Sequence, residues 1–114
     1  MMMPAFDTQR ANAFGGRLAH WHGRSGHPYD LTGESLESFS MQAGDLYLIA
    51  KGSNVLWVGS TEDLVNDPMS RTRFRLALDC ATHVFRLAAP EDRLSVIWDL
   101  EGAAPSLEST IQAA

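Results

Sequence analysis

The sequence predicts a small α+β domain: a three-stranded antiparallel sheet in the order β-β-α-β-α, flanked by helices, with an irregular N-terminal arm. Two apolar runs around a short turn at residues 51–54 indicate a β-hairpin. Apolar residues that recur at helical spacing farther along the chain indicate amphipathic helices. The length of 114 residues, with 45% hydrophobic and 20% charged residues, is typical of one globular domain.

Residues 1–44 are predicted to form the irregular arm. Their glycines and prolines leave room only for short elements, a helical turn at 7–14 and a short helix at 34–39. Three histidines lie close together in this segment: His20, His22 and His27. We interpret them as surface residues, because a structural zinc site needs four ligands and usually includes thiolates.

The predicted core spans residues 45–102, and it begins with the hairpin. Residues 46–50 and 55–59 are rich in β-branched, aromatic and other apolar side chains. Because few polar residues interrupt either run, both strands are expected to be covered on both faces.

Two helix starts follow the hairpin. Ser60 with an acid three residues later is a capping pattern, and Asp67 followed by Pro68 is a second one. The stripe of the next helix consists of Phe74, Ala77, Leu78 and Ala81. Residues 83–87 return to the alternation of a strand and are expected to join the same sheet.

The last helix is predicted to open at Pro90 and to end before Gly102, and residues 103–114 are predicted to form a flexible tail. Its apolar stripe is Leu94, Ile97 and Trp98. The residues that we expect to be buried are Leu48, Val58, Phe74, Leu78, Phe85, Ile97 and Trp98.

Composition excludes several classes of protein. No apolar run approaches the ~20 residues that span a bilayer. A single cysteine, Cys80, excludes an internal disulfide, and with no secretory signal it predicts a cytoplasmic protein. The net charge of −5 argues against a dedicated nucleic-acid binder, which usually carries an excess of basic residues.

The segments Leu46-Tyr47-Leu48-Ile49 and Trp57-Val58-Gly59-Ser60-Thr61 together resemble the paired signature of the GIY-YIG nuclease family. The resemblance covers residues 44–102 and implies the same β-β-α-β-α order. It also implies phosphodiester cleavage with one divalent metal, held by a glutamate on a late helix. A tyrosine of the second half-motif would help to place the water, and an arginine would stabilise the phosphate charge.

The resemblance assigns roles to particular residues. Tyr47 and Gly59 match the two half-motifs, but Trp57 stands where the second tyrosine belongs, and an indole has no acidic hydroxyl. The arginine would be one of Arg71, Arg73 and Arg75. Glu101 matches the metal-binding glutamate and continues the apolar stripe of the last helix, so it either faces the core or reaches water past Gly102 at the helix end. Asp99 points elsewhere.

Three functional hypotheses remain open. The first is a catalytically degenerate GIY-YIG-like domain that requires no cofactor and binds a protein, or binds DNA weakly through the arginines at 71–75. The second is a Mg²⁺-dependent DNA endonuclease that uses Tyr47, Glu101 and one of those arginines. The third is an accessory protein, unrelated to nucleases, whose apolar arm packs on a partner. The acidic balance and Trp57 favour the non-enzymatic hypotheses.

Overall fold

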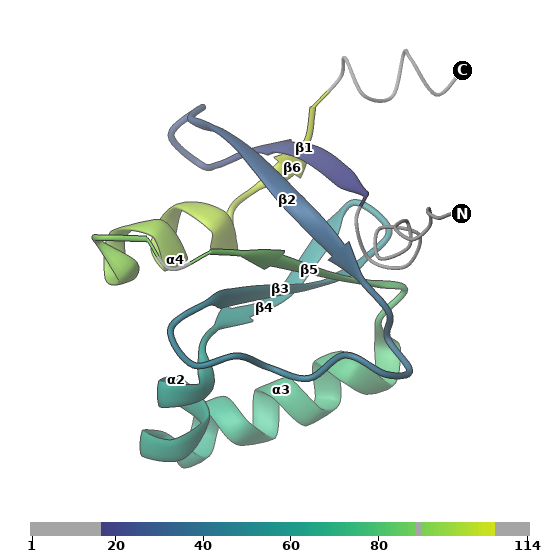
Figure 1. The fold of residues 1–114 in the computed structure, drawn as a ribbon, viewed down its shortest axis with the longest axis vertical. Coiled ribbons are helices and arrows are strands. Elements are labelled where there is room, and N and C mark those ends of the chain that lie inside the picture. Colours follow the sequence, from purple (N-terminus) through teal and green to yellow (C-terminus); the bar gives the residue numbers. More distant parts are fainter. Residues whose placement is uncertain (1–16, 89, 107–114) are drawn as a thin grey trace, which may run out of the picture.

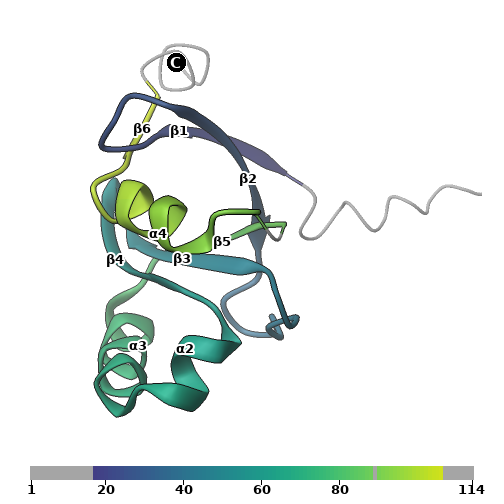
Figure 2. The ribbon, with the colours of Figure 1, turned by 90° about the vertical axis from the view of Figure 1, so that its left-hand side faces the viewer.

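The computed structural model describes residues 17–88 and 90–106, which form one six-stranded sheet and three helices. The strand order is β4-β3-β5-β2-β1-β6, and all neighbouring strands are antiparallel. The strands are β1 (Leu18–His22), β2 (Pro28–Glu34), β3 (Leu46–Lys51), β4 (Asn54–Gly59), β5 (His83–Leu87) and β6 (Ala104–Pro105). The helices are α2 (Thr61–Asn66), α3 (Pro68–Cys80) and α4 (Arg93–Glu101). The sheet curls around α4, while α2 and α3 cover its other face (Figures 1 and 2).

The predicted hairpin and its third strand are confirmed. In the β3–β4 pair, Leu48 lies opposite Val58, and in the β3–β5 pair it lies opposite Phe85. The β3–β4 register shifts at Leu56, which has no partner on β3 and therefore forms a β-bulge. As expected, most residues of β3 are buried, because helices cover both faces of this interior strand. The same expectation is wrong for the first half of β4, an edge strand in which only residues 57–59 are buried.

The predicted three-stranded sheet and irregular arm are wrong. Two further strands, β1 and β2, arise from the segment predicted to be irregular, and they bury Trp21 and Leu31 in the core. Glycines there mark turns between strands, as at Gly26, where φ is +92°. Gly44, where φ is +91°, likewise lies in the turn before β3, whereas Gly33 lies within β2.

Smaller expectations about both ends of the chain also change. The helix expected at 34–39 is absent, because Glu34 ends β2 and a turn follows. The turn expected at 7–14 lies outside the described residues. Part of the predicted tail forms β6, which pairs with β1 at Trp21 and His22.

Helices α2 and α3 begin where their capping signals predict. The Asp63 carboxylate accepts a hydrogen bond from the Ser60 backbone N–H (2.7 Å), and Asp67 accepts one from the N–H of Met69 (3.0 Å). Helices α2 and α3 lie on the face of the sheet opposite to α4 (Figure 2). The core on the α3 side consists of Tyr47, Ile49, Trp57, Ala77 and Val84.

Helix α4 differs from its prediction in start and orientation. It begins at Arg93, because Asp92 is its N-cap. Its core face is formed by Val96, Ile97 and Leu100. Trp98 was expected in the core and is instead 56% exposed, and Leu94 is 69% exposed.

Of the other residues predicted to lie in the core, some are buried and some are only partly buried. Leu48, Val58 and Phe85 are buried, as expected. Phe74, Leu78 and Ile97 are only partly buried, and they pack against the edges of the two core clusters.

Candidate functional site

A groove of about 400 Å³ runs along β4, which is an edge strand of the sheet. We call it the β4 groove. Its floor includes the four consecutive β4 residues 55–58, and its walls come from helices on opposite faces of the sheet. The wall residues are Asp63 of α2, Asp67 at the start of α3, Ser70 and Arg73 of α3, and Leu94, Ile97 and Glu101 of α4.

The β4 groove brings together three of the residues singled out by the resemblance: Trp57, Arg73 and Glu101. Arg73 and Glu101 are exposed and stand on opposite walls. In the part of the chain that the structure describes, neither side chain has a hydrogen-bond or ion-pair partner. Both charges are therefore available to a ligand.

The structure does not place the other candidate residues in this groove. Tyr47 is 1% exposed, and its hydroxyl accepts a hydrogen bond from the Gln42 backbone N–H (2.7 Å). Arg71 donates to the backbone carbonyls of Leu64 (2.8 Å) and Val65 (3.3 Å) at the C-terminal end of α2. Arg75 does not line the groove.

Trp57 combines a core position with a place in the groove. The residue is 6% exposed, and its ring meets that of Phe74 edge to face, with ring centroids 4.8 Å apart. Its Nε1–H donates to the Ser70 hydroxyl (3.1 Å). Gly59 is needed beside it, because a Cβ at that position would lie 2.6 Å from Trp57 Cζ2. This close approach explains why a glycine occupies position 59.

An ion pair connects the two walls of the groove. Arg93 at the start of α4 donates to Asp63 of α2 at 3.0 Å, and its Nε lies 3.4 Å from Glu62. Burial opposes ionisation of Asp63, but hydrogen bonds from Ser60 and Arg93 outweigh it, so the pKa of Asp63 is lowered. Arg93 therefore holds α4 and α2 at a set separation around the edge strand.

The excess of acidic side chains in the groove disfavours binding of a nucleic-acid phosphate backbone. Asp63, Asp67 and Glu101 face a single lining arginine, Arg73, although Arg93 neutralises Asp63 from outside the lining. Of the His, Cys, Asp and Glu side chains at 17–88 and 90–106, no three are placed to hold a metal ion together. His20, one of the three clustered histidines, pairs with Asp30 at 2.6 Å.

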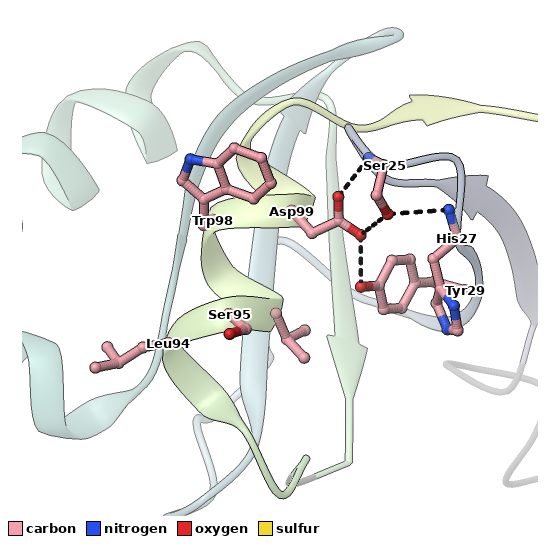
Figure 3. A pocket seen from close by; sticks show the side chains of 8 residues that line it. Ser25, His27, Tyr29, Leu94, Ser95, Trp98 and Asp99 are labelled. Atoms are coloured by element: carbon pink, nitrogen blue, oxygen red, sulfur yellow. Dashed lines mark hydrogen bonds between the residues drawn. The ribbon is translucent and has the colours of Figure 1, made fainter.

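A second site, which the sequence-based predictions do not include, is built around Asp99 (Figure 3). Asp99 is 6% exposed, and its carboxylate accepts three hydrogen bonds, from Ser25 N–H (2.6 Å), Ser25 Oγ–H (2.9 Å) and the Tyr29 hydroxyl (2.9 Å). Burial opposes ionisation, yet these bonds outweigh it and lower the pKa of Asp99. Burial, together with the hydrogen bond to Asp99 and its charge, raises the pKa of Tyr29 to about 12.

The Asp99 cluster joins the β1–β2 turn to α4. A Cβ on Gly23 would collide with the Asp99 carboxylate, so only glycine allows the turn to approach so closely. Arg24 reinforces the contact: its guanidinium lies 4.5 Å from the centroid of the Trp98 ring and donates to the Trp98 carbonyl. The cluster borders an apolar depression of about 670 Å³, lined in part by Leu94, Val96 and Trp98. Its polar groups bind one another, which is typical of a structural junction.

The inward-facing acid of α4 is Asp99 and not Glu101. Glu101 was expected to continue the buried stripe of α4, but it is exposed, and Asp99 is the buried carboxylate. The signal that could have identified Asp99 is a turn sequence with Gly23 and Ser25, which offers close backbone approach and two donors to an acid.

Two findings apply to the chain more widely. Among the described residues, no helix has the length and apolar character that crossing a membrane requires. No protein-family model, curated protein or solved structure matches this chain. A function is therefore proposed from the geometry of the β4 groove, together with the resemblance of the residues that line it.

Proposed function

We propose that this chain is a GIY-YIG-like module without nuclease activity, which binds a partner protein through the β4 groove. The observation that carries the proposal is the meeting of Trp57, Arg73 and Glu101 in that groove. The resemblance assigns the first and last of these positions to the second tyrosine and the metal-binding glutamate, and Arg73 is one of its three candidates for the arginine.

The chemistry of the groove argues for loss of catalysis. The indole of Trp57 can only donate a hydrogen bond, and it donates to Ser70, so it cannot activate water. The other motif aromatic, Tyr47, is buried and its hydroxyl is already engaged. Neither aromatic residue can take the proton of an attacking water.

The surroundings of the groove favour a protein over a nucleic acid as the partner. Exposed leucines lie along it: Leu56 and Leu94 line the β4 groove, and Leu76 lines an adjoining depression that shares Leu56 and Arg73 with it. Apolar side chains exposed together are typical of protein interfaces. Of the arginines at 71, 73 and 75, Arg71 is not free to contact phosphates, because it donates a hydrogen bond to the Leu64 carbonyl at the end of α2.

The binding proposal is tested by selecting phage-displayed random 12-residue peptides on the immobilised full chain. We expect selected peptides to bind the wild-type protein and to lose most of their affinity for a Leu94→Glu variant, which changes a groove wall. Leu18→Glu is the matched control, because Leu18 is also an exposed leucine but lies on β1. Equal loss in both variants, or no selected peptide that depends on Leu94, would overturn the proposal.

A Mg²⁺-dependent nuclease is the second candidate. It is favoured by the free Arg73 and Glu101, which face one groove as a phosphate ligand and a metal ligand would. We expect no nicking of supercoiled plasmid with Mg²⁺ or Mn²⁺. Metal-dependent nicking that disappears in Glu101→Ala and persists in Glu91→Ala, an exposed acid outside the groove, would establish the nuclease instead.

A further inference from the structure

We infer that the partner's segment binds as an added β-strand along β4, with a basic side chain toward Glu101 and an acidic side chain toward Arg73. The inference rests on the proposed function. It adds the backbone mode of binding and the charge pattern of the ligand.

Strand β4 lines the groove with consecutive residues. Successive side chains of a strand point to opposite faces, and Trp57 and Val58 do enter the cores on opposite sides of the sheet. Residues 55–58 nevertheless all line one groove. Four consecutive residues can share a groove in this way only if it follows the edge of the strand, where unpaired backbone N–H and C=O groups face outward.

The two ends of the described sheet are not equivalent. At the far end, β6 has two residues, one of which is Pro105, and proline cannot donate to a strand ladder. At the near end, β4 has six residues and contains no proline. β4 is therefore the edge that can accept another strand.

The walls define which side chains the added strand needs. In Figure 2, α4 lies on one face of the sheet and α3 on the other, with β4 between them at the edge. A strand paired with β4 would direct alternate side chains toward Glu101 on α4 and Arg73 on α3. The basic and acidic residues of the ligand are therefore separated by an odd number of positions, such as i and i+1 or i and i+3.

The bulge at Leu56 limits the length of the pairing. A bulge leaves one residue unpaired and increases the local twist, and natural edge strands use it against unwanted association. A long flat strand therefore does not fit along β4. A short segment of a few residues fits, because the helices on both sides supply contacts that a bare edge lacks.

The charge pattern is tested with the peptides selected on the full chain. We expect enrichment of a basic and an acidic residue at odd spacing. Glu101→Lys should weaken such a peptide about tenfold or more, and changing the peptide's basic residue to Glu should restore binding. Arg73→Glu should also weaken the peptide, and changing the peptide's acidic residue to Lys should restore binding. Arg75→Glu, on the same helix but outside the groove, should have little effect. Circular dichroism and the unfolding midpoint check that each variant is folded.

The backbone mode is tested by N-methylating each amide of the peptide in turn. An added strand uses alternate amides, so affinity should fall at every second position and change little between them. A uniform or irregular pattern would overturn strand addition while leaving Leu94-dependent binding, and hence the proposed function, intact. Binding that keeps this alternation but ignores the Glu101 and Arg73 reversals would overturn the charge assignment.

Discussion

Replacing Asp99 by Asn removes one charge from the junction between the β1–β2 turn and α4. The carboxylate accepts three hydrogen bonds. Hydrogen bonds to a charged group contribute about 1.5–3 kcal/mol each and neutral ones about 0.5–1.5 kcal/mol, so each bond loses about 1 kcal/mol. Because Ser25 is exposed and water can replace part of the loss, we expect Asp99→Asn to lower the free energy of unfolding by about 2–3 kcal/mol at pH 7.

The same variant has a predictable pH dependence. The pKa of Asp99 in the folded protein is lowered below its unfolded value of about 3.9. Its ionised form therefore stabilises the fold above about pH 4, and this contribution is lost as the pH falls through the folded-state pKa. The difference between wild type and Asp99→Asn should stay constant from about pH 7 to about pH 5 and shrink below about pH 4.

Urea denaturation followed by tryptophan fluorescence measures both quantities. Asp79→Asn is the matched control, because Asp79 is an exposed acid on α3 and has no described hydrogen-bond or ion-pair partner. A loss below about 0.5 kcal/mol at pH 7, the range of ordinary surface substitutions, would show that the Asp99 hydrogen bonds do not stabilise the fold. A loss that is equal at pH 7 and below pH 4 would refute the assignment to the charge.

Two further predictions concern the groove. Gly59→Ala should cost about 1–3 kcal/mol in urea denaturation, because its Cβ would lie 2.6 Å from Trp57 Cζ2. Gly33→Ala, whose Cβ would meet nothing closer than 3.6 Å, should change stability by less than about 0.5 kcal/mol, and equal costs would contradict the steric argument. Arg93→Ala should raise the pKa of Asp63, because it removes hydrogen bonds to the carboxylate. An NMR titration that gives the same pKa in both proteins would show that Arg93 does not hold Asp63.

The resemblance alone does not decide which of the three arginines belongs to the site. Arg71, Arg73 and Arg75 are equivalent candidates in the sequence, because each lies in the helix that follows the hairpin. Their roles diverge only when α2 and α3 pack at an angle that brings Arg71 to the carbonyls of Leu64 and Val65. Arg73 then remains to line the β4 groove.

Helix α4 shows the limit of periodicity. Its sequence contains apolar residues on more than one side, so the spacing alone allows either 94, 97 and 98 or 96, 97 and 100 to face the sheet. In the folded protein the second set faces the sheet. The sheet curls around α4, and Trp21, Leu31 and Phe85 form the core cluster against which this set packs. Asp99 is buried as a result, and Glu101 is left in the groove.

By itself, the sequence determined the β3–β4 hairpin, the presence of β5 and the starts of α2 and α3. These features depend on residues near one another in the chain: turn formers, β-branched runs and capping side chains. Only the tertiary structure decided that β1 and β2 extend the sheet, which face of α4 is buried, and that Asp99 holds the β1–β2 turn. Each of these depends on a partner that is distant in the chain, such as Ser25 for Asp99 or Glu34 for Arg86 on β5. A short strand between glycines carries little local signal, because its stability comes from the strands beside it.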